Sequence, residues 1–290
     1  MNNFIDGPVI VMGMHRSGTS ILCKVLSELG LFAGNDQTRK NFESYFFVQI
    51  NRWFFEQCGA SWDRPLCTRE MFANEKVYTL CREYVRKILA SPFSANYLGK
   101  KLPNGIFSVD RVWGWKDPRN TFTLPLWLDL FPNARVLNVT RNGVDVANSL
   151  QVREAARLAK REQAVAEGET LCKHGLFRAT LEHEKMKKVV LSLRCQTLDG
   201  GLALWEEYMD EAQKHIDKLD QQSMNVCYEE LLSNPVAVLD EVCNFCGLGV
   251  TEELISGAAS ALKSSRANAY LKNPNLVRFA EENEARLNRF

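Results

Sequence analysis

The sequence of 290 residues lacks any apolar run long enough to span a membrane. Its longest apolar stretches, at 8–14 and 124–131, fall well short of the ~20 residues that a spanning helix needs. The N-terminus, MNNFIDG, has no basic segment followed by an apolar one, so we expect no signal peptide. A charge excess is missing too, because 36 Lys and Arg face 35 Asp and Glu, which argues against a nucleic acid as partner. We therefore expect a soluble cytoplasmic protein.

A disulfide framework is a further feature that the sequence does not suggest. The nine cysteines are scattered and odd in number, which suits reduced thiols. Cys243 and Cys246 form a C-x-x-C pair, a spacing that also occurs in zinc and redox sites. No second ligand pair or histidine cluster accompanies them, and they fall in the helical pattern VLDEVCNFCGL. We interpret both as core residues and predict no metal site.

The apolar pattern alternates short strands with helices. Strands are predicted at 8–13, around 112–115, at 134–140 and within 223–232, where a strand runs into a short helix. Helices are predicted at 19–30, 42–57, 76–90, 121–131, 143–167, around 205–208, at 235–246 and at 251–263. This alternation predicts an α/β fold, in which a central, mainly parallel sheet lies between helices as a three-layer sandwich.

One region departs from that pattern. Residues 153–196 are rich in Arg, Lys and Glu and have the least core-like pattern of the chain. We interpret them as a helical excursion or lid on a single domain that spans residues 1–290. A solvated, charged helix is the alternative.

The first predicted strand leads into GMHRSGTS, residues 13–20, which has the glycine spacing of a phosphate loop but not its lysine. Thr19 stands in the place of that lysine, and Arg16 lies three positions earlier. A strand, a glycine turn and a helix together direct backbone N–H groups and the helix dipole at one anion. Without the lysine, and without an apolar strand that ends in a magnesium-binding Asp, the loop suits one 5′-phosphate better than a triphosphate. A tight turn without a ligand is the alternative.

A second candidate phosphate site follows the strand at 134–140. Arg141 comes directly after it, and Ser149 lies two turns into the next helix. Arginine is the natural bidentate partner of a phosphate, and open α/β sheets bind ligands at the carboxyl ends of their strands. Two phosphate sites at neighbouring strand ends predict a nucleotide that is phosphorylated in two places.

These segments resemble the motifs of the sulfotransferases that use 3′-phosphoadenosine 5′-phosphosulfate. GMHRSGTSIL resembles the 5′-phosphosulfate loop of this family, and TRNGVDVANS resembles its 3′-phosphate motif, with Gly143 where proline is usual. WGWKDPRNTFTLPLWLDLFPNARVL and NVCYEELLSNPVAVLDEVCNFCGL resemble two further blocks, so the likeness covers about residues 8 to 248. It implies a P-loop NTPase-like fold and 3′-phosphoadenosine 5′-phosphosulfate as the donor, with 3′,5′-adenosine bisphosphate as product and no metal. The acceptor would be a hydroxyl or amine of a small molecule, lipid or carbohydrate.

The resemblance also implies roles for single residues. Arg16 stands where the family has its catalytic lysine and would stabilise charge on the leaving phosphate oxygen. Glu43, in KNFESYF, would be the base that takes the proton of the acceptor, and Lys116, in GWKDPR, would bridge sulfuryl and acceptor oxygens. The residues implied to bind the donor are His15, Arg16, Ser17, Gly18, Thr19, Ser20, Arg141, Ser149 and Arg266.

Several alternatives stay open at this point. The base could instead be His15, with Asp117 and the histidines 174, 183 and 215 as further candidates, and Glu43 could merely be a carboxylate at the start of a helix. Tyr228 is assigned a structural role beneath the nucleotide. For the chain as a whole, the alternatives are a P-loop kinase or NTPase and a non-catalytic nucleotide-binding protein of the same fold.

Overall fold

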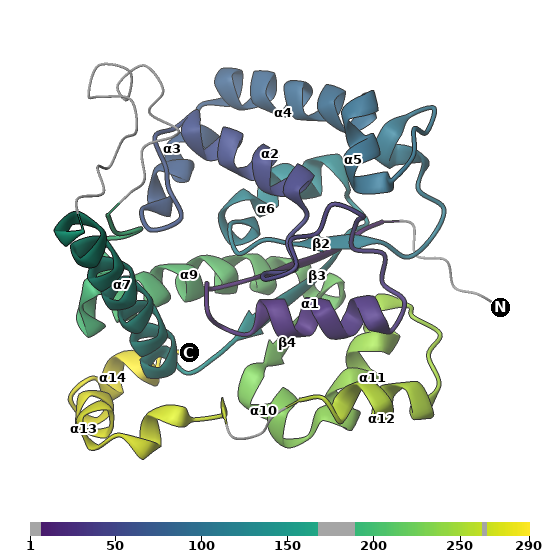
Figure 1. Ribbon diagram of the computed structural model, residues 1–290. Helices are drawn as coiled ribbons and strands as arrows, with labels where there is room; N and C mark the ends of the chain where they lie inside the picture. Colours follow the sequence, from purple (N-terminus) through teal and green to yellow (C-terminus); the bar gives the residue numbers. More distant parts are fainter. Residues whose placement is uncertain (1–6, 168–188, 263–265) are drawn as a thin grey trace.

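A parallel sheet forms the centre of the protein (Figure 1). The computed structural model describes residues 7–167, 189–262 and 266–290. In these residues the sheet has four strands in the order β2-β1-β3-β4, and every pairing is parallel. The strands are β1 (Val9–Gly13), β2 (Gly114–Lys116), β3 (Arg135–Thr140) and β4 (Ser223–Cys227). The predicted α/β fold with a central parallel sheet is confirmed.

The register of the sheet brings the carboxyl ends of neighbouring strands level. Val11 of β1 pairs with Lys116, the last residue of β2. Gly13, the last residue of β1, pairs with Val139 near the end of β3. The loop after β1, the side chain of Lys116 and the turn that begins at Arg141 therefore start from one edge of the sheet.

Helices cover both faces of this sheet (Figure 1). They are α1 (Thr19–Glu28), α2 (Tyr45–Glu56), α3 (Thr68–Ala73), α4 (Glu75–Ala90), α5 (Ala95–Leu98), α6 (Asn120–Leu130), α7 (Gly143–Ala166), α9 (Leu198–Leu219), α10 (Tyr228–Ser233), α11 (Pro235–Cys246), α12 (Glu252–Ala259), α13 (Pro274–Glu282) and α14 (Glu284–Leu287). None of the helices in the described ranges is long and apolar enough to cross a membrane.

The predicted helices are found within a few residues of their expected bounds, with some additions. α3, α5, α13 and α14 were not predicted, and α9 is much longer than the segment expected around 205–208. The predicted excursion at 153–196 begins as the second half of α7, but residues 168–188 of it lie outside the described part. Its role as a lid stays a prediction.

Side chains of β1 alternate between two hydrophobic clusters, one on each face of the sheet. Ile10 and Met12 belong to the cluster that α2, α4 and α6 cover, whereas Val9 and Val11 pack with α1 and α11. Because both faces are buried, the strand is apolar at every position, as buried parallel strands generally are. Cys243 and Cys246 lie buried in the second cluster, where burial raises the pKa of Cys243 to about 11 and of Cys246 to about 12. Their predicted core role is confirmed.

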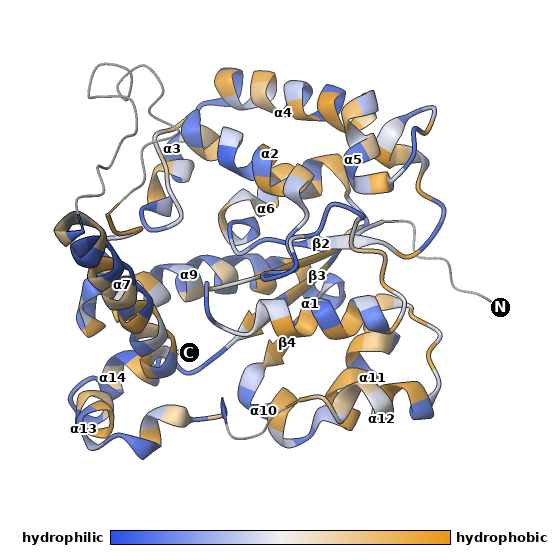
Figure 2. Cartoon of the chain, viewed as in Figure 1, coloured by the Kyte–Doolittle hydropathy of each residue, from blue (hydrophilic) through white to orange (hydrophobic). Residues whose placement is uncertain are grey.

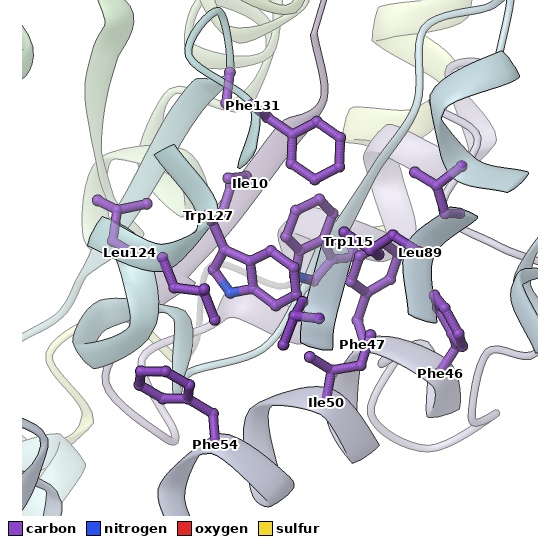
Figure 3. Packing of buried hydrophobic residues seen from close by; sticks show 14 of the residues in the cluster. Ile10, Phe46, Phe47, Ile50, Phe54, Leu89, Trp115, Leu124, Trp127 and Phe131 are labelled. Atoms are coloured by element: carbon purple, nitrogen blue, oxygen red, sulfur yellow. The ribbon is translucent and has the colours of Figure 1, made fainter. Parts of the chain in front are cut away.

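The first cluster is built around aromatic rings (Figure 3). The rings of Phe47 in α2 and Trp115 in β2 stack with centroids 3.9 Å apart, and Trp127 of α6 meets Trp115 edge-on at 4.9 Å. The side-chain amide of Asn51 joins the same helices, because it donates to Asp117 Oδ2 and to Asn120 Oδ1, each over 2.9 Å. α2 is thus fixed to the end of β2 by both apolar and polar contacts.

Truncating the central ring of this cluster should lower stability strongly. Phe47→Ala removes a fully buried ring and leaves a cavity, so we expect the free energy of unfolding to fall by about 3–5 kcal/mol. Tyr45→Ala on the same helix is the control, because Tyr45 is 57% exposed and its loss should cost under about 1 kcal/mol. Urea unfolding measures both. Equal losses in the two variants would contradict the assigned packing.

Candidate functional site

The loop between β1 and α1 winds tightly against the start of α10. Gly18 is the N-cap of α1 and has φ 102°, in the left-handed region that favours glycine. A Cβ at this position would collide with the ring of Tyr228. Arg16 has a positive φ as well, 74°, and Ser17 closes the turn by donating its hydroxyl to the carbonyl oxygen of Met14 over 2.7 Å. The left-handed turn and the close approach of Tyr228 thus both require glycine at position 18, and the turn leads into the positive N-terminal end of α1.

A buried lysine joins this loop to a carboxylate. Lys116 Nζ donates to Ser20 Oγ over 3.2 Å and to Glu43 Oε1 over 2.8 Å. The side chain of Lys116 is 2% exposed and that of Glu43 14%, so the ion pair is largely shielded from water. These three predicted site residues come from α1, from the segment before α2 and from β2, and the structure brings them together.

The segment before α2 holds Glu43 in place by its own hydrogen bonds. The carboxylate of Asp36 accepts from Ser44 Oγ over 3.1 Å and from the amide of Phe46 over 2.7 Å, which satisfies the first turn of α2. The amide of Thr38 donates to the carbonyl oxygen of Glu43 over 2.9 Å. Among the described residues, none donates a hydrogen bond to Glu43 Oε2, so this oxygen is available to a ligand.

The predicted 3′-phosphate residues lie on the other side of the loop. Arg16 Nε donates to Ser149 Oγ over 2.9 Å, and Arg141 Nη1 donates to the carbonyl oxygen of Arg16 over 3.1 Å. Arg141 also lies over the ring of Tyr228, 4.6 Å from its centroid, and donates to the carbonyl oxygen of Arg266 over 3.3 Å. The structure therefore places Arg16 beside Ser149, and the cation beside Ser20 is Lys116.

Asp145 has a role that sequence reasoning missed. Its carboxylate accepts from Arg141 Nη2 over 3.2 Å and from the amides of Ala269 and Tyr270 over 3.1 and 2.8 Å. It thus docks the segment after Arg266 beside Arg141. The available signal was an aspartate four residues after an arginine at the start of a helix, which places the two side chains together.

His15 lies in an aromatic and cationic setting. Its ring meets the edges of Trp62 and Tyr208, with centroids 4.9 and 5.9 Å apart, and its Nε2 is buried with no hydrogen-bond partner in the described ranges. Burial, followed by the charges of Arg119, Arg153, Lys116 and Arg16, lowers the pKa of His15 well below its ordinary value. The imidazole is therefore neutral near pH 7. No sequence pattern indicated that Trp62, Tyr208 or Arg153 would lie here, since each reaches the loop from a distant part of the chain.

The other candidate bases have structural partners. Asp117 is fully buried and its Oδ1 accepts from Arg119 Nε over 2.9 Å, and although burial opposes it, this carboxylate raises the pKa of Arg119. His215 Nε2 lies 2.9 Å from the carbonyl oxygen of Thr121 in a buried position. His174 and His183 lie outside the described residues. In the part of the chain that the structure describes, no three His, Cys, Asp or Glu side chains gather as metal ligands would.

A sequence model described as the sulfotransferase family matches residues 8–252, which run from β1 to the start of α12. The chain belongs to the sulfotransferase family. The phosphate loop, the Lys116–Glu43 pair and the Arg141 site all lie within the matched residues. No curated protein sequence matches the chain.

Solved structures match this chain at low sequence identity. A sulfotransferase domain from the curacin biosynthetic pathway is 14% identical with a TM-score of 0.49, and the match covers 97% of this chain and 98% of that one. A sulfotransferase from Mycobacterium avium is 13% identical with a TM-score of 0.43 over 96% and 77%. Retinol dehydratase in complex with androsterone and the inactive cofactor PAP is 16% identical with a TM-score of 0.37 over 90% and 67%.

The neutral state of His15 predicts how stability depends on pH. Because its pKa is lowered in the folded protein, the unfolded chain binds the proton more readily, and stability is lost as the pH falls below about 6.5. We expect His15→Gln to weaken this loss between pH 7 and pH 5, by at most about 1.4 kcal/mol per pH unit. Urea unfolding at several pH values measures it. Parallel pH profiles of variant and wild type would mean that His15 is protonated equally in both states.

Proposed function

We propose that this protein transfers a sulfuryl group from 3′-phosphoadenosine 5′-phosphosulfate to a hydroxyl or amine of a small-molecule, lipid or carbohydrate acceptor. The observation that carries the proposal is the position of Lys116, whose ammonium lies between Ser20 of the phosphate loop and the carboxylate of Glu43. Membership of the sulfotransferase family supports the reaction type. The donor, the acceptor class, a single domain and a cytoplasmic location remain our inferences.

The residues at the edge of the sheet fit a donor with two phosphate positions. Arg141 Nε is buried and has no hydrogen-bond partner in the described ranges, so it is available to donate to a bound anion. The loop leads directly into the N-terminus of α1, which Thr19 and Ser20 begin, so its backbone amides and the helix dipole suit an anion. We assign the 5′-phosphosulfate to the loop.

We assign the 3′-phosphate to the neighbouring residues around Arg141. Arg141 and Ser149 lie at the end of β3 and on α7, and Arg16 contacts both of them. Arg266 is held beside Arg141 through its carbonyl oxygen, which places its side chain in the same region. Arginine suits this task because its planar group binds two phosphate oxygens at once.

The geometry supports a division of labour in the transfer step. The donor supplies the sulfuryl group, whose bond to the phosphate oxygen breaks as the acceptor oxygen bonds to sulfur, and the electron pair leaves with the phosphate. Glu43 Oε2 would take the proton of the acceptor while Lys116 holds Oε1 of the same carboxylate. Lys116 and the loop amides stabilise the developing charge, and such preorganised donors typically contribute ~3–4 kcal/mol each. Arg16 would act on the leaving oxygen from the side of Ser149.

A non-catalytic nucleotide-binding protein of the same fold is the main competing reading. Both readings expect binding of 3′,5′-adenosine bisphosphate, but only the enzyme modifies an acceptor. Incubation with the donor and a panel of hydroxyl and amine compounds, followed by mass spectrometry for the gain of one sulfuryl group, separates them. A thermal-shift measurement covers the third reading. A rise in melting temperature with ATP and Mg²⁺, and none with the bisphosphate, would favour a kinase or NTPase.

Loss of the Arg141 guanidinium should weaken nucleotide binding. Arg141→Ala removes charge-assisted hydrogen bonds to the 3′-phosphate, each worth ~1.5–3 kcal/mol, so we expect the bisphosphate to bind 10- to 100-fold more weakly. Titration calorimetry measures this, with circular dichroism to check folding. The control is Arg86→Ala, because Arg86 is an exposed arginine of α4. Unchanged affinity in a folded Arg141→Ala variant would remove this residue from the site.

Substitution of Glu43 should separate chemistry from binding. Glu43→Gln keeps the shape of the side chain but cannot take a proton, so turnover should fall by ~10²–10⁴ while bisphosphate affinity stays nearly intact. Release of the bisphosphate with an acceptor from the panel measures turnover. His15→Ala should reduce turnover only mildly. An inactive His15→Ala variant beside an active Glu43→Gln variant would identify the loop histidine as the base.

A further inference from the structure

Two arginines, Arg153 and Arg157, form a row along one face of α7 that begins beside Ser149 of the proposed donor site. Ser149, Arg153 and Arg157 are spaced by four residues, so they follow one another along the same side of the helix. Ser149 accepts the hydrogen bond of Arg16, which fixes the beginning of the row at the phosphate loop. From there, α7 extends away from the sheet edge (Figure 1), with hydrophilic residues over much of its length (Figure 2).

Arg153 lies close to the place where an acceptor must bind. Its guanidinium stacks over the ring of Trp62, 4.7 Å from the centroid, and that ring meets His15 of the loop at 4.9 Å. His15 is within electrostatic range of both Arg153 and Lys116, since both charges lower its pKa after the larger effect of burial. The row and the Lys116–Glu43 pair therefore flank the same stretch of the loop.

The carboxylates around this stretch do not balance its cations. Glu43 is engaged by Lys116 and Asp117 by Arg119. Glu207 is likewise paired, with Arg194 over 2.6 Å, whereas Asp63 accepts only from the neutral hydroxyl of Ser61, over 2.7 Å, among the described residues. In the described part of the chain, no carboxylate lies within ion-pair distance of Arg157.

The carboxylate beside Arg153 is shared. Glu154 is fully buried, and while its Oε1 accepts from Arg153 Nε over 2.9 Å, its Oε2 accepts from the amides of Leu191 and Ser192 over 2.7 and 3.3 Å. Glu154 thus also ties the returning chain to α7. Glu154 is the counter-charge of Arg153, and because it also accepts from two backbone amides it fixes the position of this guanidinium.

Two guanidinium nitrogens in the row have unused donors. Arg153 Nη2 and Arg157 Nε are both buried, and neither makes a hydrogen bond to any described residue. Arg153 Nη2 lies 2.8 Å from Glu154 Oε1, but without the alignment of a hydrogen bond. Buried donors of charged groups are seldom left unpaired, because their lost hydration is not replaced. An acceptor of hydrogen bonds would satisfy both donors, and an anionic acceptor would do so most strongly because each donor belongs to a cation.

We propose that Arg153 and Arg157 bind an anionic group of the acceptor, a carboxylate, sulfate or phosphate, while the reacting hydroxyl or amine lies at Glu43. This inference rests on the proposed function and narrows its acceptor to a small molecule with a negative charge. The proposed anion would contact only these two arginines, so its binding does not require a large positive net charge, and the net charge of the chain is only +1. The stacked Trp62 restricts Arg153 to one orientation and gives the guanidinium a fixed direction.

The test uses binding to the protein saturated with 3′,5′-adenosine bisphosphate, so that the donor site is filled. A panel of phenolic and aliphatic hydroxy carboxylates, and the methyl ester of each, is titrated calorimetrically into wild type, Arg157→Gln and Arg86→Gln. Wild type and the exposed Arg86 control should bind at least one acid about tenfold or more tightly than its ester. Arg157→Gln should lose that preference and keep its affinity for the bisphosphate. Arg153→Gln is a second variant, whose folding is checked first because Arg153 pairs with the buried Glu154.

Each other outcome overturns a defined part of the argument. If wild type binds the bisphosphate but no acid of the panel more tightly than its ester, the anion site is wrong and the proposed function stands. If Arg157→Gln and folded Arg153→Gln lose affinity for the bisphosphate instead, the two arginines bind the donor and not the acceptor. If wild type does not bind the bisphosphate, the proposed function fails and this inference with it.

Discussion

The site is organised by the burial of one ammonium group. Lys116 ends β2 with its side chain 2% exposed, and a charge in that position must be paired because its hydration is lost. Glu43 supplies the opposite charge and Ser20 a further hydrogen bond. These partners lie far from Lys116 in the sequence, so the same interaction that compensates the lysine also closes the phosphate loop, the segment before α2 and the sheet edge into one site.

Much of the fold could be predicted because the determining signals are local. β1 consists of four apolar residues and a glycine, and α1 follows a glycine turn. The sequence of about twenty positions therefore determines the strand, the loop and the helix. Two of the missed helices, α13 and α14, lack such signals. α13 is amphipathic but has only Leu276 buried, and α14 has no buried residue, so neither resembled a core helix in the sequence.

The structure brings together residues that the sequence had suggested for one site, but the contacts between them could not be predicted. Motif spacing assigned Lys116 and Glu43 to the site, yet nothing in either segment indicated that the two side chains pair, because the hairpin-like path around Asp36 that turns Glu43 inward is set by tertiary hydrogen bonds. Arg16 illustrates the same limit. It was expected to bind the donor and to act at the leaving oxygen, but nothing in the sequence indicated that its side chain would donate to Ser149 on α7. Spacing along the chain determines which strand end a residue follows, whereas side-chain partners depend on distant elements.

The docking of the C-terminal segment by Asp145 has a consequence for the nucleotide site that we propose. The carboxylate of Asp145 accepts from Arg141 and from the amides of Ala269 and Tyr270. The docking of the C-terminal segment and the orientation of the guanidinium are therefore coupled in one equilibrium. Any ligand that binds only the docked arrangement has an observed affinity equal to its intrinsic affinity multiplied by the docked fraction. If the proposed donor site is correct, the C-terminal segment is thermodynamically linked to residues more than a hundred positions earlier, and changes in α13 or α14 would alter the affinity without contacting the nucleotide.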